Sequence, residues 1–411
     1  MEIKLRILIE IFLRMVCANR HKSIRMGEIQ VGKSKWVLLA VLLGMMVMMT
    51  GCFGPTPKGG IEGFVFAPTD DAVSRGGEPL LVKGLVEVPA GYRPLKDAIV
   101  TVKGTFSRDI TDGSGHFLLD GITVGHKELT VTHPNYQPYS QEIHVYEGRP
   151  TKIDSPGIKL GIGYYLLIGV SNPEHSIYIP GCENGWTAPE LQGPARDLDA
   201  MEYALTQHDT CVGKYSTRLD DDATVANVLN DIRYLISLMK DNDYLVIYFS
   251  GHGIGGEDKW RFDAIVLHDG LLADYELEEA LTNSGLDRRK NKVTLIIDAC
   301  HSGSFADGNI WRLRAPTSKA FMKWGYTVLA SSNPNQESEE DLYGTSTYGA
   351  FTYHLVRGLV GDGRKADRNS DGAITAQEAR LHINEQMIRE GRDQRAELWS
   401  SGNDTVIFKY R

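Results

Sequence analysis

The sequence predicts an α/β three-layer sandwich with a mostly parallel sheet, preceded by a small all-β sandwich. Residues 245–253 and 294–303 each begin as a short apolar run and end abruptly in small and polar residues, as buried parallel strands do. Segments of helical period alternate with such runs, which indicates a sheet covered on both faces. Residues 61–160 show only short strands split by Gly and Pro. Because 411 residues exceed one ordinary core, we expect two folded domains behind a leader.

The first element is a leader over residues 1–52. Residues 37–49 form an apolar run that is short for a membrane span and suits the core of a secretory signal. The run closes at Met49-Thr-Gly-Cys52, which resembles a bacterial lipobox. The resemblance implies a lipidated Cys52 and a membrane-anchored bacterial lipoprotein on the extracytoplasmic side, periplasmic or at the cell surface. An uncleaved anchor helix is the alternative, and a start at Met26 would give a leader of conventional length.

The charge of the chain bounds its partners. The formal net charge is −9, and the basic leader leaves the remainder near −14. That balance argues against nucleic acid or an anionic membrane surface as the partner, and it is compatible with a basic substrate. The hydrophobic content of 42% and the charged content of 24% are typical of a soluble globular protein.

Cysteine usage sets one residue apart. If Cys17 is lost with the leader and Cys52 is acylated, then Cys182, Cys211 and Cys300 remain. Outside the cell a disulfide between Cys182 and Cys211 is one possible pairing, which would leave Cys300 as the odd thiol.

After a short Gly/Pro linker at 53–60, residues 61–160 form the predicted β-sandwich. The predicted strands lie at 61–66, 98–103, 116–119, 127–132 and 142–146. The glycine-bearing first strand, Ala98-Ile-Val-Thr-Val, Thr111-Asp-Gly-Ser-Gly-His-Phe117 and the aromatic Tyr136 resemble the carboxypeptidase regulatory-like (transthyretin-like) domain. Its histidines are scattered, so we expect a spacer, an adhesion surface or a substrate-recognition surface in place of a catalytic role.

The second domain, residues 161–411, alternates strands and helices. Predicted strands lie at 163–170, 245–252, 294–300 and 327–332, and predicted helices lie within 191–205 and at 223–240, 271–284 and 349–359. In open parallel sheets the chemistry collects beyond the carboxyl ends of the strands. His252 and Cys300 follow two such ends, so one sheet can bring them together.

A thiol beside an imidazole is the minimal machinery for covalent acyl transfer. We expect His252 to lower the pKa of the Cys300 thiol and then to donate a proton to the leaving amine. Glycines flank the histidine, and the N–H groups of Gly253 and Cys300 are the candidate oxyanion donors. The structural alternative is a buried thiol and an unrelated loop histidine.

The blocks Ser250-Gly-His-Gly253 and Asp298-Ala-Cys-His-Ser-Gly303 resemble the signature blocks of caspase-like cysteine peptidases, metacaspase branch. The resemblance covers roughly residues 160–400 and implies the caspase-like fold and a cysteine endopeptidase. In that reading His252 is the general base and acid, and Cys300 is the nucleophile. A non-catalytic surface binding or adhesion protein, and a transpeptidase using the same thioester, are the competing functions.

The same resemblance implies a substrate pocket. The acids and the serine that bind a basic P1 side chain in metacaspases map onto Asp197, Ser250 and Asp298. Carboxylates in a partly buried slot would favour Arg or Lys through charge-assisted hydrogen bonds. Alternatively, Asp197 caps its helix and Asp298 binds nearby backbone. Arg196 stands where the family often has asparagine, which puts the pocket in doubt.

Residues 304–326 contain three basic residues, Arg312, Arg314 and Lys319, in a Gly/Pro-bearing segment just after the nucleophile. We expect an exposed loop and a self-processing site, because basic residues would suit the enzyme's own pocket.

Residues 367–378 match a twelve-residue EF-hand loop at positions one, three, five, six and twelve. The predicted calcium ligands are Asp367, Asn369, Asp371, the carbonyl of Ala373, and Glu378. Gly372 permits the sharp turn, and a helix is expected on either side. We expect a structural Ca²⁺; an acidic turn without metal is the alternative.

Overall fold

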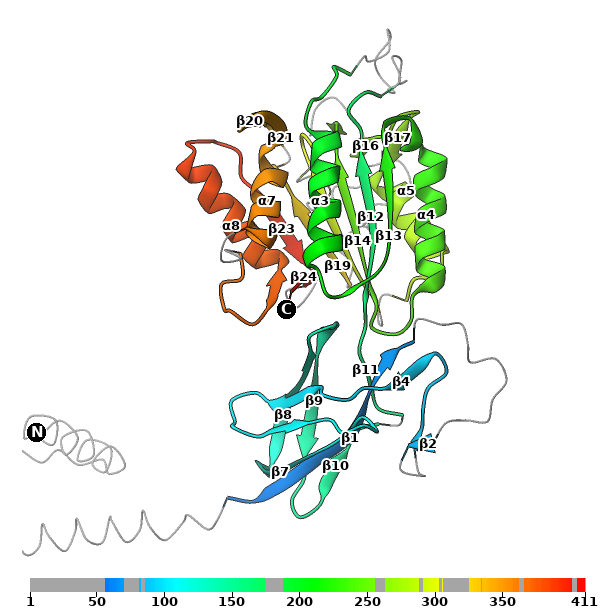
Figure 1. Cartoon of the computed structure of the whole chain (residues 1–411), viewed down its shortest axis with the longest axis vertical. Coiled ribbons are helices and arrows are strands. Elements are labelled where there is room, and N and C mark those ends of the chain that lie inside the picture. The colour runs from blue at the N-terminus through cyan, green and yellow to red at the C-terminus, as the bar shows by residue number, and fades with distance from the viewer. Residues whose placement is uncertain are drawn as a thin grey trace, which may run out of the picture. The chain divides into compact units, whose positions relative to one another are not determined.

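The computed structural model describes residues 56–69, 81–82, 86–154, 156–173, 188–255, 263–287, 291–302, 305, 325–333, 335–361, 366–400 and 405–410. Within these ranges an all-β region precedes an α/β region (Figure 1), which confirms the predicted fold class. The leader with Cys52, and the basic residues of the 304–326 loop, lie outside the described residues. No helix in the described part of the chain is long and apolar enough to cross a membrane.

The all-β region packs two sheets around one apolar core. One sheet is centred on β1 (Lys58–Pro68), whose partners are β4 (Tyr92–Pro94), β7 (His116–Thr123), β10 (Pro150–Lys152) and β11 (Ile158–Lys159). The other has the order β6-β5-β8-β9, with β5 (Ile99–Val102), β6 (Arg108–Ile110), β8 (Gly125–His133) and β9 (Tyr136–Val145). A short separate pair is formed by β2 (Leu81–Val82) and β3 (Val86–Glu87). Alternate side chains such as Val100 and Val131 enter the core, and all five predicted strands are present.

The α/β region is built on a six-stranded sheet of order β13-β12-β14-β18-β19-β23. Its strands are β12 (Gly163–Gly169), β13 (Val212–Leu219), β14 (Tyr244–Ser250), β18 (Lys292–Asp298), β19 (Tyr326–Ala330) and β23 (Glu397–Ser400). All neighbours are parallel except β23, which runs antiparallel to β19. The edge strands β13 and β23 were not predicted, because both carry mixed polar residues and no apolar run.

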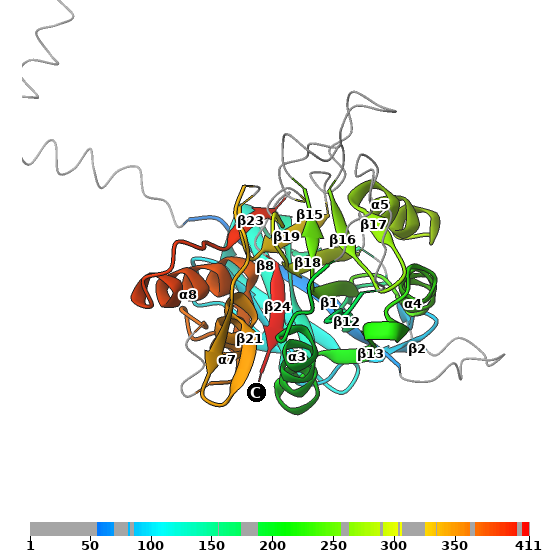
Figure 2. The same ribbon diagram turned by 90° about the horizontal axis from the view of Figure 1, so that it is seen from above.

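Helices cover both faces of this sheet. They are α3 (Pro194–His208), α4 (Val225–Leu238), α5 (Asp274–Asn283), α7 (Ala350–Val360) and α8 (Ala376–Arg389). Along β12, Leu166 packs with α4 and α5 in one core, while Leu167 packs with α3, α7 and α8 in the other. Figure 2 shows α7 and α8 on the side away from α4 and α5. The helix expected from residue 271 begins three residues later.

That difference has a local cause. Residues 271–273 form β17 (Leu271–Ala273), the third strand of a small antiparallel sheet with β15 (Gly253–Ile254) and β16 (Ala264–Val266). Two further pairs complete the region. A hairpin of β20 (Glu340–Tyr343) and β21 (Ser346–Gly349) precedes α7, and β22 (Ala373–Thr375) pairs with β24 (Val406–Lys409).

The two regions contact each other within one compact unit, Pro57–Arg411. The Nζ atom of Lys240, after α4, donates to the carbonyls of Thr69 at 3.1 Å and Gly91 at 2.9 Å. Lys159 forms an ion pair of 2.8 Å with Asp241. Each link joins the all-β region to the loop before β14.

Candidate active site

The parallel sheet brings the predicted site residues to one edge. Ser250 at the end of β14 is in register with Asp298 at the end of β18, and Gly169 ends β12 beside them. His252 and Cys300 each follow two residues later. Because parallel strands end at the same edge, the two signature blocks lie side by side.

A small pocket of about 70 Å³ contains both predicted catalytic residues and all three predicted substrate-binding residues. Its lining residues are Leu191, Pro194, Asp197, Ser250, Gly251, His252, Asp298, Cys300, Ser338, Glu339, Glu340 and Gly349. They come from the start of α3, the ends of β14 and β18, and the hairpin before α7. The pocket therefore depends on four segments that are distant in sequence.

Two buried carboxylates form the floor of the pocket. Asp197, which is 0% exposed, accepts hydrogen bonds from Ser250 Oγ at 2.8 Å and from the Gly349 N–H at 3.1 Å. Asp298 accepts hydrogen bonds from Ser338 Oγ and Thr352 Oγ1, both at 2.7 Å. Both carboxylates therefore have partners within the protein.

Burial sets the charge of these two acids. Burial raises the pKa of Asp197 well above its usual range, and the nearby charge of Asp298 raises it further. Burial also raises the pKa of Asp298, against the hydrogen bonds from Ser338 and Thr352. Holding two negative charges together here is unfavourable without a cation, so a positively charged group between them would be stabilised.

Gly349, between the two acids, was not identified from the sequence. A Cβ atom at this position would lie 2.3 Å from Asp298 Oδ2 and 2.9 Å from Asp197 Oδ2. A glycine is needed for the start of α7 to pack against both carboxylates.

The Cys300 thiol faces the segment before β20. Its Sγ accepts a hydrogen bond from the Ser338 N–H at 3.4 Å and lies 3.8 Å from the Ser338 carbonyl. Burial raises the pKa of the thiol, and the charges of Glu337 and Asp298 add to this, while the Ser338 N–H opposes it. The thiol is therefore neutral at rest.

This direction differs from the sequence-based expectation that His252 lowers the thiol pKa. Burial lowers the pKa of His252 itself, so the ring is neutral near neutral pH and provides no positive charge for a thiolate. The negative charge of Glu340 acts against this shift but does not reverse it. The resting pair is thus a thiol and a neutral imidazole.

His252 is oriented by a backbone carbonyl. Its Nε2 lies 2.7 Å from the Pro189 oxygen. Because a carbonyl oxygen only accepts, the proton of the neutral ring is on Nε2, and Nδ1 carries the lone pair. Nδ1 is therefore the atom that can act as a base.

The turn after Cys300 packs tightly against β15. A Cβ atom on Gly253 would lie 2.3 Å from the Cys300 carbonyl oxygen and 3.0 Å from the Ala299 Cβ. His301 has a left-handed backbone with φ +58°, and its N–H donates to the Gln336 carbonyl at 2.9 Å. The turn so formed places the N–H groups of Gly253 and Cys300, the predicted oxyanion donors, in adjoining segments.

The wall opposite these strands is the segment from Gln336 to Tyr343, which the sequence analysis did not identify. Ser338 contacts both Cys300 and Asp298, and Glu339 and Glu340 line the pocket. No apolar run marks this segment. Its only sequence signal is a cluster of acidic residues before a predicted helix.

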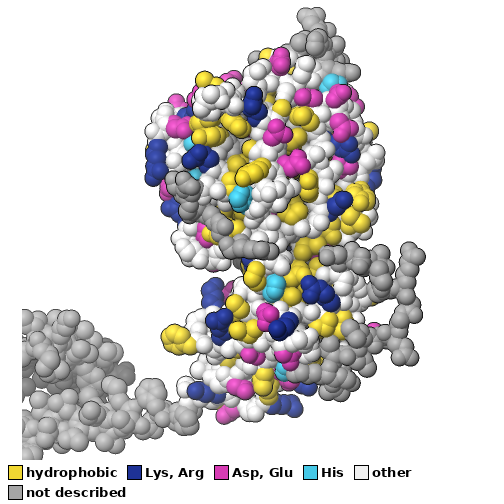
Figure 3. Space-filling model, in the orientation of Figure 1, with side chains coloured by type: hydrophobic (Ala, Val, Ile, Leu, Met, Phe, Trp, Pro, Cys, Tyr) yellow, Lys and Arg dark blue, Asp and Glu magenta, His cyan; other side chains and the backbone are white. Residues whose placement is uncertain are grey.

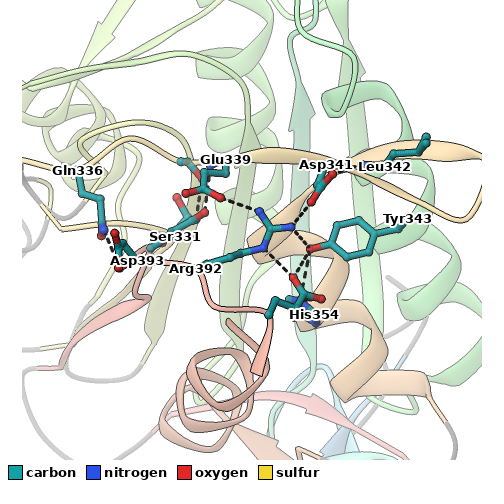
Figure 4. A network of polar contacts seen from close by, with 12 residues as sticks. Ser331, Gln336, Glu339, Asp341, Leu342, Tyr343, His354, Arg392 and Asp393 are labelled. Atoms are coloured by element: carbon teal, nitrogen blue, oxygen red, sulfur yellow. Dashed lines mark hydrogen bonds and ion pairs between the residues drawn. The ribbon is translucent and has the colours of Figure 1, made fainter. Parts of the chain in front are cut away.

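A network of polar contacts braces this wall (Figure 4). Arg392, whose side chain is 11% exposed, forms ion pairs with Glu339 at 2.6 Å, with Glu390 at 2.7 Å and with Asp341. Gln394 donates to Ser338 Oγ at 3.0 Å and to the Ser331 carbonyl at 3.0 Å. The segment after α8 therefore holds this wall of the pocket in place.

The predicted calcium loop has oxygen donors of the right type, but they are hydrogen-bonded to protein groups and do not converge on one point. Asp367 accepts hydrogen bonds from the N–H groups of Ser370, Asp371 and Gly372, and Gly372 has φ +84°. Glu378 accepts hydrogen bonds from Thr375 at the N-cap of α8. In the described residues no three His, Cys, Asp or Glu side chains are arranged to hold a metal ion. The donor types fit Ca²⁺, but convergence would require these carboxylates to leave their present partners.

The suggested Cys182–Cys211 disulfide is not formed. Cys211 is a free thiol, 1% exposed, in the apolar core under α3. Its burial shields it from solvent and raises its pKa. Cys182 lies outside the described residues.

Comparison with known families agrees with this architecture. The caspase domain family matches residues 166–406, and the chain belongs to this family. The carboxypeptidase regulatory-like domain matches residues 82–156, in the all-β region.

The individual relatives have low sequence identity to this chain. Metacaspase-1 of Lodderomyces elongisporus is 26% identical over 181 residues, which cover 39% of this chain and 40% of that protein. Metacaspase-1A of Aspergillus clavatus is 24% identical over 202 residues, covering 44% and 46%. The chain thus spans less than half the length of either relative. Protein GSU0716 of Geobacter sulfurreducens, a solved structure, is 20% identical with a TM-score of 0.41, covering 61% of this chain and 97% of that one.

Proposed function

We propose that this protein is a cysteine endopeptidase in which Cys300 is the nucleophile and His252 the general base and acid. The observation that carries the proposal is the pocket that both residues line together with Asp197, Ser250 and Asp298. Membership of the caspase domain family supports it. Protein or peptide chains are the proposed substrates.

In the proposed mechanism the neutral His252 ring removes the thiol proton through Nδ1 as the sulfur attacks the scissile carbonyl. The Pro189 carbonyl keeps the ring in this tautomer. The N–H groups of Gly253 and Cys300 stabilise the oxyanion of the tetrahedral intermediate. The imidazolium then donates its proton to the leaving amine, and water hydrolyses the thioester with His252 again as base.

We further propose cleavage after Arg or Lys. The buried acid pair supports this preference, since a guanidinium or ammonium group would compensate both carboxylates. Acidic and basic side chains are interspersed on the face shown in Figure 3, and with the negative net charge this supports the expectation that nucleic acid is not a partner.

Hydrolysis of a mixed fluorogenic peptide set by residues 53–411, beside Cys300→Ala, tests the proposal. We expect cleavage after Arg or Lys that the variant lacks. Cleavage after other residues would retain the peptidase and remove the roles of Asp197, Ser250 and Asp298. No cleavage by a folded chain would favour the non-catalytic binding protein. Conjugates formed with an added amine would favour a transpeptidase.

We propose a structural Ca²⁺ at residues 367–378, held by Asp367, Asn369, Asp371, the Ala373 carbonyl and Glu378. The loop turn at Gly372 and the pairing of Ile374 with Phe408 support it. Calcium should raise the melting temperature of the wild type, and Asp371→Asn should abolish the increase. The exposed Asp154→Asn is the control. An equal response of Asp371→Asn would contradict the site.

We propose a membrane-anchored, extracytoplasmic location and self-processing within residues 304–326. A lipid on Cys52 would place the protein at the extracytoplasmic membrane face, and a lipid label lost in Cys52→Ser would support it. Cleavage at Arg312, Arg314 or Lys319 should appear as two fragments by mass spectrometry, and a fully active intact chain would exclude it.

A further inference from the structure

Glu340, the first residue of β20, is a further carboxylate of the pocket beside Asp197, Asp298 and Glu339. Its Oε1 accepts a hydrogen bond from the Gly193 N–H at 2.7 Å, and its Oε2 accepts one from the Gln192 N–H at 3.1 Å. Gly193 is the N-cap of α3 and has no side-chain cap of its own. Glu340 therefore provides, from a distant hairpin, an acceptor for the start of the helix that carries Asp197.

The packing around this contact is tight. A Cβ atom on Gly193 would lie 2.7 Å from Glu340 Oε1 and 2.8 Å from the Gly349 nitrogen. Gly193, in the loop before α3, thus lies against both the Glu340 carboxylate and Gly349 at the floor of the pocket. Any movement of Glu340 would be transmitted to the rim of the pocket at Leu191 and Pro194, which line it.

The four carboxylates of the pocket differ in exposure and in their partners. Asp197 and Asp298 are buried and bound by Ser250, Gly349, Ser338 and Thr352. Glu339 is exposed and is paired with Arg392. Glu340 is half-buried, and its hydrogen bonds are to the N–H groups of Gln192 and Gly193. Each of its oxygens has a second lone pair beyond the one that the loop N–H groups use.

We propose that Glu340 is a specificity-determining residue that binds the cationic end of the substrate side chain while holding residues 191–193 in place. This inference rests on the proposed peptidase function. The ligand class is a guanidinium or ammonium group, whose several N–H donors suit acceptors on more than one side. The negative charge of Glu340 also acts on His252, whose protonated form it favours.

The test compares two peptides that differ only in arginine or citrulline at P1, since citrulline keeps the shape and removes the charge. Glu340→Gln should lower the arginine-to-citrulline ratio of kcat/KM about tenfold or more, mainly through KM. Glu340→Asp keeps the charge and should retain the ratio. Glu337→Gln removes a nearby charge that does not contact the loop, and should leave the ratio unchanged.

An arginine-to-citrulline ratio that Glu340→Gln leaves unchanged would overturn the specificity role. If kcat/KM then falls equally for both peptides, Glu340 only supports the loop. If Glu340→Gln does not fold, loss of the ratio in Glu340→Asp overturns it. Calorimetric binding of the arginine peptide to Cys300→Ala, with and without Glu340→Gln, needs no catalysis. Failure of the peptidase proposal is therefore distinguishable from failure of this one.

Discussion

Gly253 and Gly349 leave space that a single methyl group would occupy. At Gly253 a Cβ atom would overlap the Cys300 carbonyl, and at Gly349 it would overlap the Asp298 carboxylate. Neither glycine has a left-handed backbone. Their role is therefore steric, since they allow β15 and the start of α7 to approach the site.

We expect Gly253→Ala to lower kcat/KM about 100-fold, because the added carbon must displace the turn that carries the proposed nucleophile, Cys300. A loss of stability of about 1–3 kcal/mol should accompany it. The control is Gly270→Ala, whose nearest neighbour would be a Val225 methyl group at 3.6 Å. Equal activity of the two variants, measured with one fluorogenic peptide, would show that the turn tolerates the methyl group.

The protonation state of Cys300 predicts its reactivity toward iodoacetamide. Only the thiolate is alkylated, and burial raises the thiol pKa, so the rate should be low at neutral pH and rise as the pH passes above the ordinary thiol range. As pH falls through the pKa of His252, which burial lowers below the ordinary imidazole range, the ring gains a proton and peptide hydrolysis should be lost.

The measurement is the difference in labelling between wild type and Cys300→Ala, which removes the contribution of other cysteines. A fast rate that does not change between pH 5 and 8 would indicate a thiolate–imidazolium pair instead.

The hairpin β20–β21 and the segment after α8 act together. Arg392 forms ion pairs with Glu339 and Asp341 (Figure 4). It also pairs with Glu390, and Gln394 donates a hydrogen bond to Ser338. These bonds fix the segment that contacts the thiol. Because α8 also begins at the predicted calcium loop, one helix joins that loop to the wall of the pocket formed by residues 336–343.

Arg392→Ala should destabilise the protein by about 1–3 kcal/mol, since three carboxylates would be left together without their cation. Activity should fall further than stability explains, because the wall loosens. The matched control is Arg368→Ala, whose partner Glu385 is exposed, and a change below about 1 kcal/mol is expected. Urea unfolding measures the change in stability, and kcat/KM measures the change in activity. Similar effects of Arg392→Ala and Arg368→Ala would contradict the bracing role of Arg392.

The all-β and α/β regions are joined by Lys240, Lys159 and Tyr92, whose hydroxyl donates to the Asp241 carbonyl at 3.2 Å. Most of the acceptors in these contacts are backbone carbonyl oxygens. The loop before β14, which belongs to the α/β region, is therefore hydrogen-bonded to the all-β region.

Lys240→Met should lower the free energy of unfolding by about 1–2 kcal/mol, because two carbonyl acceptors lose their donor. Calorimetry of the chain should show one transition in the wild type at a higher temperature than in the variant. Lys103→Met, which removes an exposed pair with Glu128, should have little effect. A wild-type chain that melts in two separate steps would contradict this coupling.

Much of the fold was predictable because its signals are local. Apolar runs marked β12, β14, β18 and β19, and helical period marked α4 and α7, since a buried element must carry its own apolar residues. The edge strands β13 and β23 were missed because pairing alone stabilises them. The register of Ser250 with Asp298 followed from two parallel strands ending at one edge.

The fold class and the meeting of His252 with Cys300 were predicted from short apolar runs and the residues that end them. The grouping of Asp197, Ser250 and Asp298 was predicted from the resemblance to metacaspases. Only the tertiary structure revealed Ser338, Glu340, Gly349 and the Arg392 brace. It also reversed the expected pKa shift of the thiol, since burial and neighbouring charges come from segments far apart in sequence. Such contacts have no local pattern, and folding alone brings them together.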